Sequence, residues 1–249
     1  MQIAKDAVGK FEMVVAVGGD GTVNEIASAI VGTGTQLGII PFGSGNGLAR
    51  FLGIPMDTVK AIKTLTTGHV EAIDSATLNG RPFFNMAGMG FDAHIAEVFS
   101  HDKKRGFITY IKSAFEEISK YKPELYQIEI DGKKMEREAF MLSFANSSQY
   151  GNNAHISPDA SVQDGLIDVC VIKQFPFWRL IEMGIRMMTK TTNKSSYLEI
   201  FRGKHVNVKR IASGPVHLDG EPHTEGAEMI IDVIPASLQV ITGPGYKRA

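Results

Sequence analysis

Two glycine-rich stretches near the start of the chain contain residue types that bind phosphate. The first lies in VVAVGGDGTVNEIASAI (Val14–Ile30), where apolar residues lead into Gly18, Gly19 and Gly21 and an amphipathic segment follows. Glycines leave backbone N–H groups unobstructed, and the N-terminus of a helix favours anions. Asp20, among these glycines, would repel a phosphate unless a cation lay between them. Because Mg²⁺ typically binds one or two carboxylates together with phosphate oxygens, the stretch predicts a metal–nucleotide site.

The same letters have a simpler interpretation, an Asp-Gly turn with Thr22 as the N-cap of the next helix. The second stretch, PFGSGNGLAR (Pro41–Arg50), favours the ligand, because it places another glycine turn after the next strand. Ligands of open α/β sheets bind at the carboxyl ends of the strands. Neither stretch has the spacing of a Walker A loop, a Rossmann fingerprint or a G-x-S-x-G nucleophile elbow.

Both turns contribute candidate nucleotide-binding residues. We expect the side chains of Ser44 and Asn46 to hydrogen-bond to the nucleotide, and Thr22 and Asn24 either to cap the helix or to donate to phosphate. The full set is Gly18, Gly19, Asp20, Gly21, Thr22, Asn24, Glu25, Gly43, Ser44, Gly45 and Asn46.

Alternating helices and strands must position these turns. Continuous apolar strands that alternate with helices predict a doubly wound parallel sheet, covered on both faces. We expect this α/β domain to span residues 1–70, with the C-terminal segment 238–249 returning to it. The predicted elements are a helix over Gln2–Val8, a strand over Met13–Val17, a helix over Val23–Ile30, a strand over Gln36–Gly43 and a helix over Thr58–Thr66.

From residue 71 onward the pattern becomes short, alternating and punctuated by turns. The pairs Asn79-Gly80 and Asp131-Gly132 predict β-hairpins,. Helical patterns interrupt the strands at Ile108–Ser119 and Phe177–Met188. We therefore expect an antiparallel β-sandwich over residues 71–237, and a cleft between the two domains that binds the small-molecule substrate.

The segment HLDGEP (His217–Pro222) adds two carboxylates, Asp219 and Glu221. On an extended segment positions i and i+2 point the same way, so both groups would face one cleft. The alternative is a solvated turn without a catalytic role.

Composition limits the class of protein. The chain has 249 residues, 43% of them hydrophobic and 21% charged, with a net charge of −1, so no overall field attracts nucleic acid,. Cys170 is the single cysteine, which excludes an internal disulfide. The chain lacks both an apolar run of the ~20 residues that a transmembrane helix needs and a secretory signal. We expect a cytoplasmic protein, at most peripheral to a membrane.

At the level of whole motifs the chain resembles the diacylglycerol kinase and sphingosine kinase superfamily, particularly its bacterial lipid kinases. The two glycine stretches carry this resemblance in order, and it continues through FNMAGMGFDAHIA, KRGFITYIKSA, SPDASVQDGLIDV, HLDGEP and IPASLQVITG. It implies an α/β nucleotide domain, a β-sandwich domain of the kind shared with NAD kinases, and an active site between them. The implied reaction is phosphoryl transfer from ATP, with Mg²⁺, to a lipid hydroxyl. The implied acceptor is diacylglycerol, a sphingoid base or a related lipid.

The resemblance also assigns roles to residues. It implies that Glu221 is the catalytic base and that Asp219 and Asp20 hold the catalytic Mg²⁺. It further implies a structural Mg²⁺ on the Asp164 side chain and the carbonyls of Ser161 and Leu166. A plain Asp-Gly turn before a strand is the alternative at Asp164.

The chain also departs from the usual pattern of the family that it resembles. Gly47 follows Asn46 where many relatives have aspartate, and GGDGT begins at Gly18, so the usual preceding Asn-Pro-x-Ser-Gly strand has no counterpart. A truncated fragment is therefore one interpretation. The rival functions are an NAD kinase-like enzyme and a non-catalytic nucleotide- or lipid-binding protein.

Three weaker signals concern the lipid. The helix over Phe177–Met188 has an apolar face that fits a lipid interface, but packing on the sandwich is the favoured expectation. The basic loop His101–Gly106 would meet lipid headgroups or simply be solvated. Asp92 would touch the acceptor headgroup or stabilise a helix N-terminus. We expect a lipid substrate at a membrane surface and no nucleic acid, and a homodimer is left open.

Overall fold

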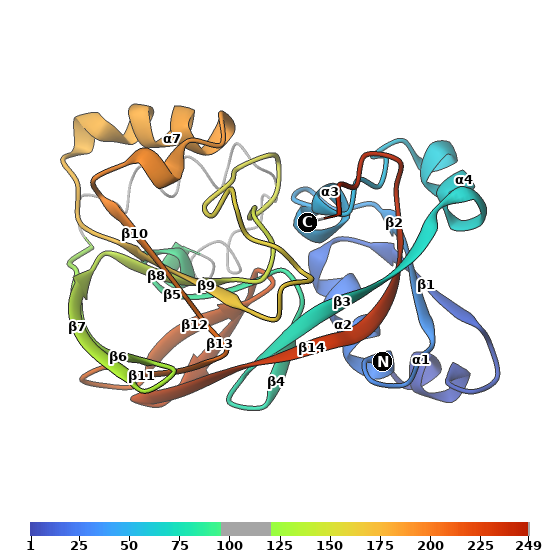
Figure 1. Ribbon diagram of the computed structural model, residues 1–249, viewed down its shortest axis with the longest axis horizontal. Coiled ribbons are helices and arrows are strands. Elements are labelled where there is room, and N and C mark those ends of the chain that lie inside the picture. Colours follow the sequence, from blue (N-terminus) through green and yellow to red (C-terminus); the bar gives the residue numbers. More distant parts are fainter. Residues whose placement is uncertain (96–120, 249) are drawn as a thin grey trace.

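The structure, a computed structural model, describes residues 1–95 and 121–248, and Figure 1 shows an α/β part beside a β-sandwich. The predicted helix over Ile108–Ser119 and the basic loop His101–Gly106 lie outside the described residues. Elsewhere the predicted fold class is confirmed, with the difference that the sheet of the α/β part is mixed rather than purely parallel.

The α/β part follows the predicted order of elements. Its helix α2 begins at Asp20, three residues before the predicted Val23, because Gly19 in an extended conformation serves as the N-cap and the following residues already turn helically. The second strand ends at Pro41, before the glycine turn begins. The elements are α1 (Gln2–Ala7), β1 (Met13–Gly18), α2 (Asp20–Ile30), β2 (Gln36–Pro41), α3 (Gly47–Phe51) and α4 (Thr58–Thr67).

Two long strands, β3 (His69–Leu78) and β14 (Glu228–Thr242), run through both parts of the molecule. At its C-terminal end β14 pairs in parallel with β2, which pairs in parallel with β1. Along its length β14 is antiparallel to β3, and the register shifts at a bulge between Ile234 and Leu238. Bulges bend a strand and increase its twist, so this one marks the bend between the two parts.

A buried carboxylate stabilises this bend. Asp74 on β3 accepts hydrogen bonds from the backbone N–H of Ala236 in the bulge, at 2.8 Å, and of Gly165 in a neighbouring loop, at 2.7 Å. Ala236 has a positive φ of 49°, a conformation that is uncommon for a residue other than glycine,. The carboxylate therefore satisfies a backbone amide that the bulge removes from the strand ladder.

The β-sandwich packs the antiparallel half of this first sheet against a second sheet. Both predicted hairpins are present, joining β3 to β4 at Asn79-Gly80 and β6 to β7 at Asp131-Gly132, each with positive φ at both turn residues. Tyr126, Phe83 and Phe144 are fully buried between the sheets. The first sheet contributes β3, β4 (Arg81–Phe83), β6 (Glu124–Ile130), β7 (Lys133–Ala139), β11 (His205–Lys209) and β14. The second has the order β10 (Leu198–Gly203), β9 (Ile167–Ile172), β8 (Met141–Ala145), β5 (Met86–Gly90), β12 (Gly214–Leu218) and β13 (Glu221–Glu225).

Helix α7 (Leu180–Met188), preceded by the 3₁₀ turn η1 (Phe177–Arg179), lies at the periphery of the sandwich (Figure 1). A second 3₁₀ turn, η2 (Thr192–Lys194), follows it. Among the described helices, none is both long enough and apolar enough to cross a bilayer.

Candidate active site

The two glycine turns pack directly against each other. Gly43, which follows β2, lies against Gly19 after β1, and a Cβ added at Gly43 would come within 2.5 Å of the Gly19 Cα. The Phe42 amide donates to the Gly18 carbonyl at 2.8 Å. Backbone approach this close requires glycine, so the two turns form one surface at the carboxyl ends of β1 and β2.

Asp20 joins these turns through its side chain. One carboxylate oxygen accepts from the backbone N–H of Asn46 at 2.8 Å, and the other from that of Gly47 at 2.7 Å. Burial, and then the negative charge of Asp219, raise the pKa of Asp20 to about 6. Each oxygen has a second lone pair in addition to the one used by an amide, so Asp20 retains capacity for a metal or a donor.

Asn46 stabilises its own turn. It has a left-handed backbone, with φ of 53°, and its side-chain amide donates to the Gly43 carbonyl at 2.7 Å while its oxygen accepts from the Gly43 N–H at 2.9 Å. These side-chain groups therefore already have protein partners. Ser44 is exposed at the tip of the turn, where its carbonyl accepts from the side chain of Asn152 at 2.8 Å.

The N-terminus of α2 has no side-chain cap. The alternative that Thr22 is the N-cap is wrong, since Gly19 occupies that position and the Thr22 side chain lies over Gly18, where an added Cβ would be 2.6 Å from its Oγ1. Backbone N–H groups in the first turn of a helix need a partner from outside it. This end of α2 is thus suited to an anion.

Two other predicted nucleotide-binding residues lie further along α2 and contact protein groups. Asn24 donates to Asp219 at 2.8 Å and to the Pro82 carbonyl at 3.1 Å, and so ties α2 to the sandwich. Glu25 accepts from the amino group of Met1 at 2.5 Å.

Asp219 is buried, with 7% of its surface exposed, and accepts four hydrogen bonds. Its donors are the side chain of Asn24 at 2.8 Å and the backbone N–H groups of Phe84, Asn85 and Met86 at 2.9–3.0 Å. Burial raises the pKa of Asp219 above its ordinary value, although these hydrogen bonds oppose the shift. A carboxylate has about four acceptor sites, and the protein uses that number here.

Glu221 lies two residues after Asp219 but, unlike Asp219, is exposed. The expected extended segment is wrong, because Asp219 and Gly220, with φ of 49° and 86°, form the turn of the β12–β13 hairpin. Glu221 begins β13, is exposed, and reaches the start of α2, where a Cβ added at Gly21 would lie 2.2 Å from its Oε1. Both carboxylates therefore lie at α2. Asp219 is buried and bonds Asn24, and Glu221 is exposed beside Gly21.

The turn predicted to hold a structural metal is stabilised by hydrogen bonds between its own residues. Asp164 accepts from the Leu166 N–H at 3.0 Å, and the Ser161 hydroxyl accepts from the Gln163 N–H at 3.1 Å. Within residues 1–95 and 121–248 no group of three or more His, Cys, Asp or Glu side chains is arranged to hold a metal ion. Any metal here would depend on carbonyls, water or phosphate for its remaining ligands.

A buried polar cluster of the sandwich was not predicted from the sequence. Asp92 Oδ2 lies 3.1 Å from His217 Nε2 and accepts from the hydroxyls of Ser143 at 3.1 Å and Tyr150 at 3.2 Å. Gly88 gives the cluster room, since a Cβ there would be 2.2 Å from Asp92 Oδ2. The sequence indicates only Asp92, because these side chains come together only in the folded sheet, where β5 pairs with both β8 and β12.

Two protein-family models match the chain, one after the other along the sequence. The model of the diacylglycerol kinase catalytic domain matches residues 1–78, and that of the YegS C-terminal NAD kinase beta sandwich-like domain matches residues 85–242. A diacylglycerol kinase of Bacillus subtilis is 29% identical over 220 residues, which are 86% of this chain and 73% of that protein. A Klebsiella pneumoniae protein described as "Probable lipid kinase YegS-like" is 30% identical over 240 residues, 92% of this chain and 77% of the relative.

Solved structures show the same fold. A diacylglycerol kinase from Bacillus anthracis superposes with a TM-score of 0.77 at 21% identity, over 99% of this chain and 82% of that one. An NAD kinase from Archaeoglobus fulgidus, solved in complex with ATP, gives a TM-score of 0.52 at 15% identity, over 96% and 81% of the two chains. The model of the sandwich domain covers more than half of the chain, and the Klebsiella pneumoniae relative is 30% identical over 77% of its own length, so the chain belongs to the bacterial diacylglycerol kinase and YegS-like lipid kinase family.

Proposed function

We propose that this protein is an ATP- and Mg²⁺-dependent lipid kinase that transfers the γ-phosphoryl group to the hydroxyl of diacylglycerol, a sphingoid base or a related lipid. The position of Glu221 against Gly21 is the observation that carries the proposal. It brings an exposed carboxylate from the sandwich to the glycine turn and uncapped helix end that suit the phosphates. An acceptor hydroxyl bound from the sandwich side would lie close to both the Glu221 carboxylate and the phosphates.

Glu221 acts as the general base in this proposal. A lipid hydroxyl is a weak nucleophile, and a carboxylate within hydrogen-bond reach accepts its proton as the new phosphate ester bond forms. Phosphoryl transfer otherwise requires alignment and charge neutralisation, which the backbone amides of Gly19 and Gly21 would supply.

The donor set fits a Mg²⁺ ion held mainly by phosphate oxygens and water, with Asp20 as its protein ligand. Asp20 retains a lone pair on each oxygen, and a bound cation would offset the two causes that raise the pKa of Asp20, burial first and then the negative charge of Asp219,. When bound, the ion would neutralise charge on the phosphates. Because four protein donors use the acceptor sites of Asp219, we infer that this residue contributes its charge and the shape of the turn.

The structural metal at Asp164, with the carbonyls of Ser161 and Leu166, also stays a proposal. Its test is calorimetric titration of Mg²⁺ into the wild type and Asp164→Ala without nucleotide. Heat that is lost in the variant supports the site, and equal heats from both proteins contradict it.

An NAD kinase-like activity and a non-catalytic binding role are the rivals. The NAD kinase relation rests on the fold, and the solved NAD kinase with ATP supports nucleotide use by this architecture. Labelled ATP offered with a lipid panel and, separately, with NAD⁺ distinguishes all three. Labelled phospholipid product supports the proposal, labelled NADP⁺ would replace it with the first rival, and nucleotide binding without transfer to either acceptor would support the second.

Mutation of the base sharpens this test. We expect Glu221→Gln to lower kcat by about 10²–10⁴-fold, because the amide cannot accept the proton, while ATP binding stays within about threefold. A variant with near-wild-type kcat would remove Glu221 from the mechanism.

A further inference from the structure

Helix α7 and the 3₁₀ turn η1 that precedes it present an apolar stripe to solvent. The exposed fractions of Trp178, Ile181, Ile185 and Met188 are 76, 70, 57 and 55%. These positions are three or four residues apart and therefore share one face of the helix. Isolated exposed apolar residues are ordinary, but a continuous stripe indicates an interaction surface.

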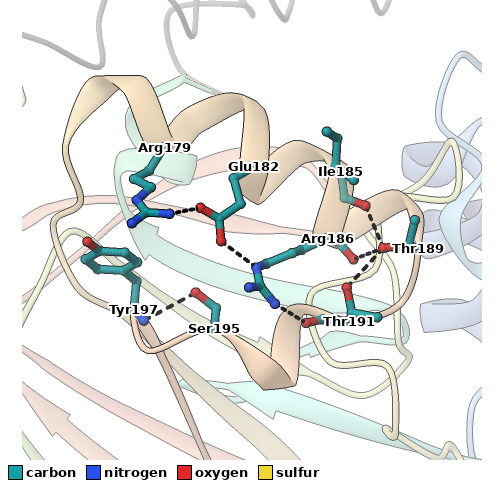
Figure 2. A network of polar contacts seen from close by, with 8 residues as sticks. All are labelled: Arg179, Glu182, Ile185, Arg186, Thr189, Thr191, Ser195 and Tyr197. Atoms are coloured by element: carbon teal, nitrogen blue, oxygen red, sulfur yellow. Dashed lines mark hydrogen bonds and ion pairs between the residues drawn. The ribbon is translucent and has the colours of Figure 1, made fainter.

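The other two faces of α7 already have partners. Met183 is buried and Met187 packs against a core cluster of the sandwich, so the expectation of packing holds for that side. Figure 2 shows a second, polar side, where Glu182 accepts hydrogen bonds from both Arg179 and Arg186. The Ile185 carbonyl accepts from Thr189, and the Ile185 side chain points away from the network. The sandwich and the polar network fix the helix, and within residues 1–95 and 121–248 they leave the apolar stripe exposed.

The charge around the stripe indicates which surface would cover it. From residue 176 to 195 the chain has four basic residues, Arg179, Arg186, Lys190 and Lys194, and a single acidic one, Glu182. This segment therefore has a net positive charge, whereas the whole chain has a net charge of −1. A stripe of tryptophan and aliphatic side chains flanked by basic residues is the pattern of helices that lie in the interface of anionic membranes.

A line of aromatic rings connects α7 with the interior of the sandwich. Phe91, next to Asp92, stacks on Phe140 at 4.5 Å between ring centroids, and Phe140 meets Phe175 at 6.0 Å. Phe175 leads directly into η1 and α7. Packed aromatic rings thus extend from the residue next to Asp92 to the segment that leads into η1.

We propose that α7 is the membrane-docking element of this protein, and that Trp178, Ile181, Ile185 and Met188 insert into the interface of a bilayer that contains anionic lipid. The proposal rests on the proposed function, since a kinase that acts on a membrane lipid must reach its acceptor there. Contact between α7 and a second copy of the chain is the alternative occupant.

Trp178 is the only tryptophan of the chain, so its fluorescence reports on this stripe alone. The experiment mixes the full-length protein, without nucleotide, with vesicles of phosphatidylglycerol and phosphatidylcholine. We expect a blue shift, quenching by brominated lipid, and at least about tenfold weaker binding to pure phosphatidylcholine or at high salt. Sedimentation with vesicles without any change in Trp178 would place docking elsewhere. A blue shift that appears without vesicles as protein concentration rises would indicate a second copy. Either result overturns the proposal.

A pair of matched variants separates this helix from general surface hydrophobicity. Ile181→Ser/Ile185→Ser should weaken vesicle binding by about tenfold or more, because two inserted side chains are lost. Val59→Ser/Ile62→Ser on α4 removes two exposed aliphatic groups, of 75 and 51% exposure, from the other domain and should leave binding unchanged. Equal losses in both proteins would overturn the assignment to α7.

A final assay distinguishes the two proposals. Phosphoryl transfer to a short-chain, water-dispersed diacylglycerol should be equal in the wild type and Ile181→Ser/Ile185→Ser, because that acceptor needs no bilayer. A wild type that binds vesicles through Trp178 but transfers no phosphate would refute the proposed function and leave the docking helix in place. Loss of transfer in the variant on this acceptor would show that α7 acts on the active site rather than on the membrane.

Discussion

Asp219 and Glu221 lie two residues apart, yet the fold treats them in opposite ways. Asp219 is buried and accepts four hydrogen bonds, whereas Glu221 is exposed and reaches across to Gly21. The difference arises from the turn at Asp219-Gly220. Asp219 lies within this turn, whereas Glu221 is the first residue of the next strand, β13. Asp219 stabilises the fold through its hydrogen bonds, and Glu221 stays available for chemistry.

This comparison shows how a single motif connects two domains. Through Asn24, Asp219 fixes the sandwich hairpin to α2, and through Phe84, Asn85 and Met86 it organises the start of β5. The same hairpin places Glu221 beside Gly21, at the start of α2. Rigid support beneath a reactive group is what precise positioning requires.

The largest effect on stability is expected from Asp219→Ala. Three backbone amides and the Asn24 side chain would lose their acceptor in a buried place, so the free energy of unfolding should fall by about 3–5 kcal/mol in urea denaturation. Glu221→Ala is the matched control and should change it by less than about 0.5 kcal/mol. If the two variants unfold at the same urea concentration, the division of labour between these carboxylates is wrong.

A smaller loss is expected from Gly43→Ala, which would separate the two glycine turns. The added methyl group meets the Gly19 backbone rather than a movable side chain, so we expect about 1–3 kcal/mol of destabilisation and weaker ATP binding,. Gly226→Ala is the control, because a Cβ there has open space. Calorimetric ATP titration and urea denaturation check both variants, and unchanged ATP affinity in Gly43→Ala would show that the turns do not form the nucleotide site.

The smallest effect concerns the pH dependence of metal-free protein. The pKa of Asp20 is about 6 in the folded protein against 3.8 for an ordinary aspartate, so the folded state binds this proton more tightly. The stabilisation is fully present below about pH 4 and is lost as pH rises through 6, by about 1–2 kcal/mol once solvent access is allowed for. Asp20→Asn has no such group. The difference in unfolding free energy, wild type minus variant, should therefore decrease between pH 4 and 7, and a flat difference would contradict the buried, repelled carboxylate.

Local sequence signals predicted much of this fold. Apolar strands, glycine turns and Asn-Gly or Asp-Gly pairs identify β1, β2 and two hairpins, because these depend on backbone conformation within a few residues. The same rule would have identified the turn at Asp219-Gly220. The i, i+2 argument failed there because it assumes an extended chain.

The contacts that assemble the site could not be predicted from local sequence patterns, because they join residues far apart in the chain. Asp74 meets Ala236 across 162 residues, and Asp219 meets Asn24 across 195. Whether Asn46 donates to a ligand or to its own turn depends on a left-handed backbone that only the folded loop reveals. Patterns predict which residue types gather at a sheet edge, and packing decides which of their hydrogen bonds the protein itself uses.

The central claim, that Asp219 supports while Glu221 reacts, is tested most directly by a crystal structure with Mg²⁺ and a non-hydrolysable ATP analogue. The account predicts phosphates over Gly19, Gly21 and Gly43, and the Glu221 carboxylate within about 3–3.5 Å of the site that an acceptor hydroxyl would occupy. Asp219 should keep its bonds to Phe84, Asn85 and Met86. An Asp219 carboxylate that has released these amides to bind the metal, with Glu221 turned to solvent, would contradict it.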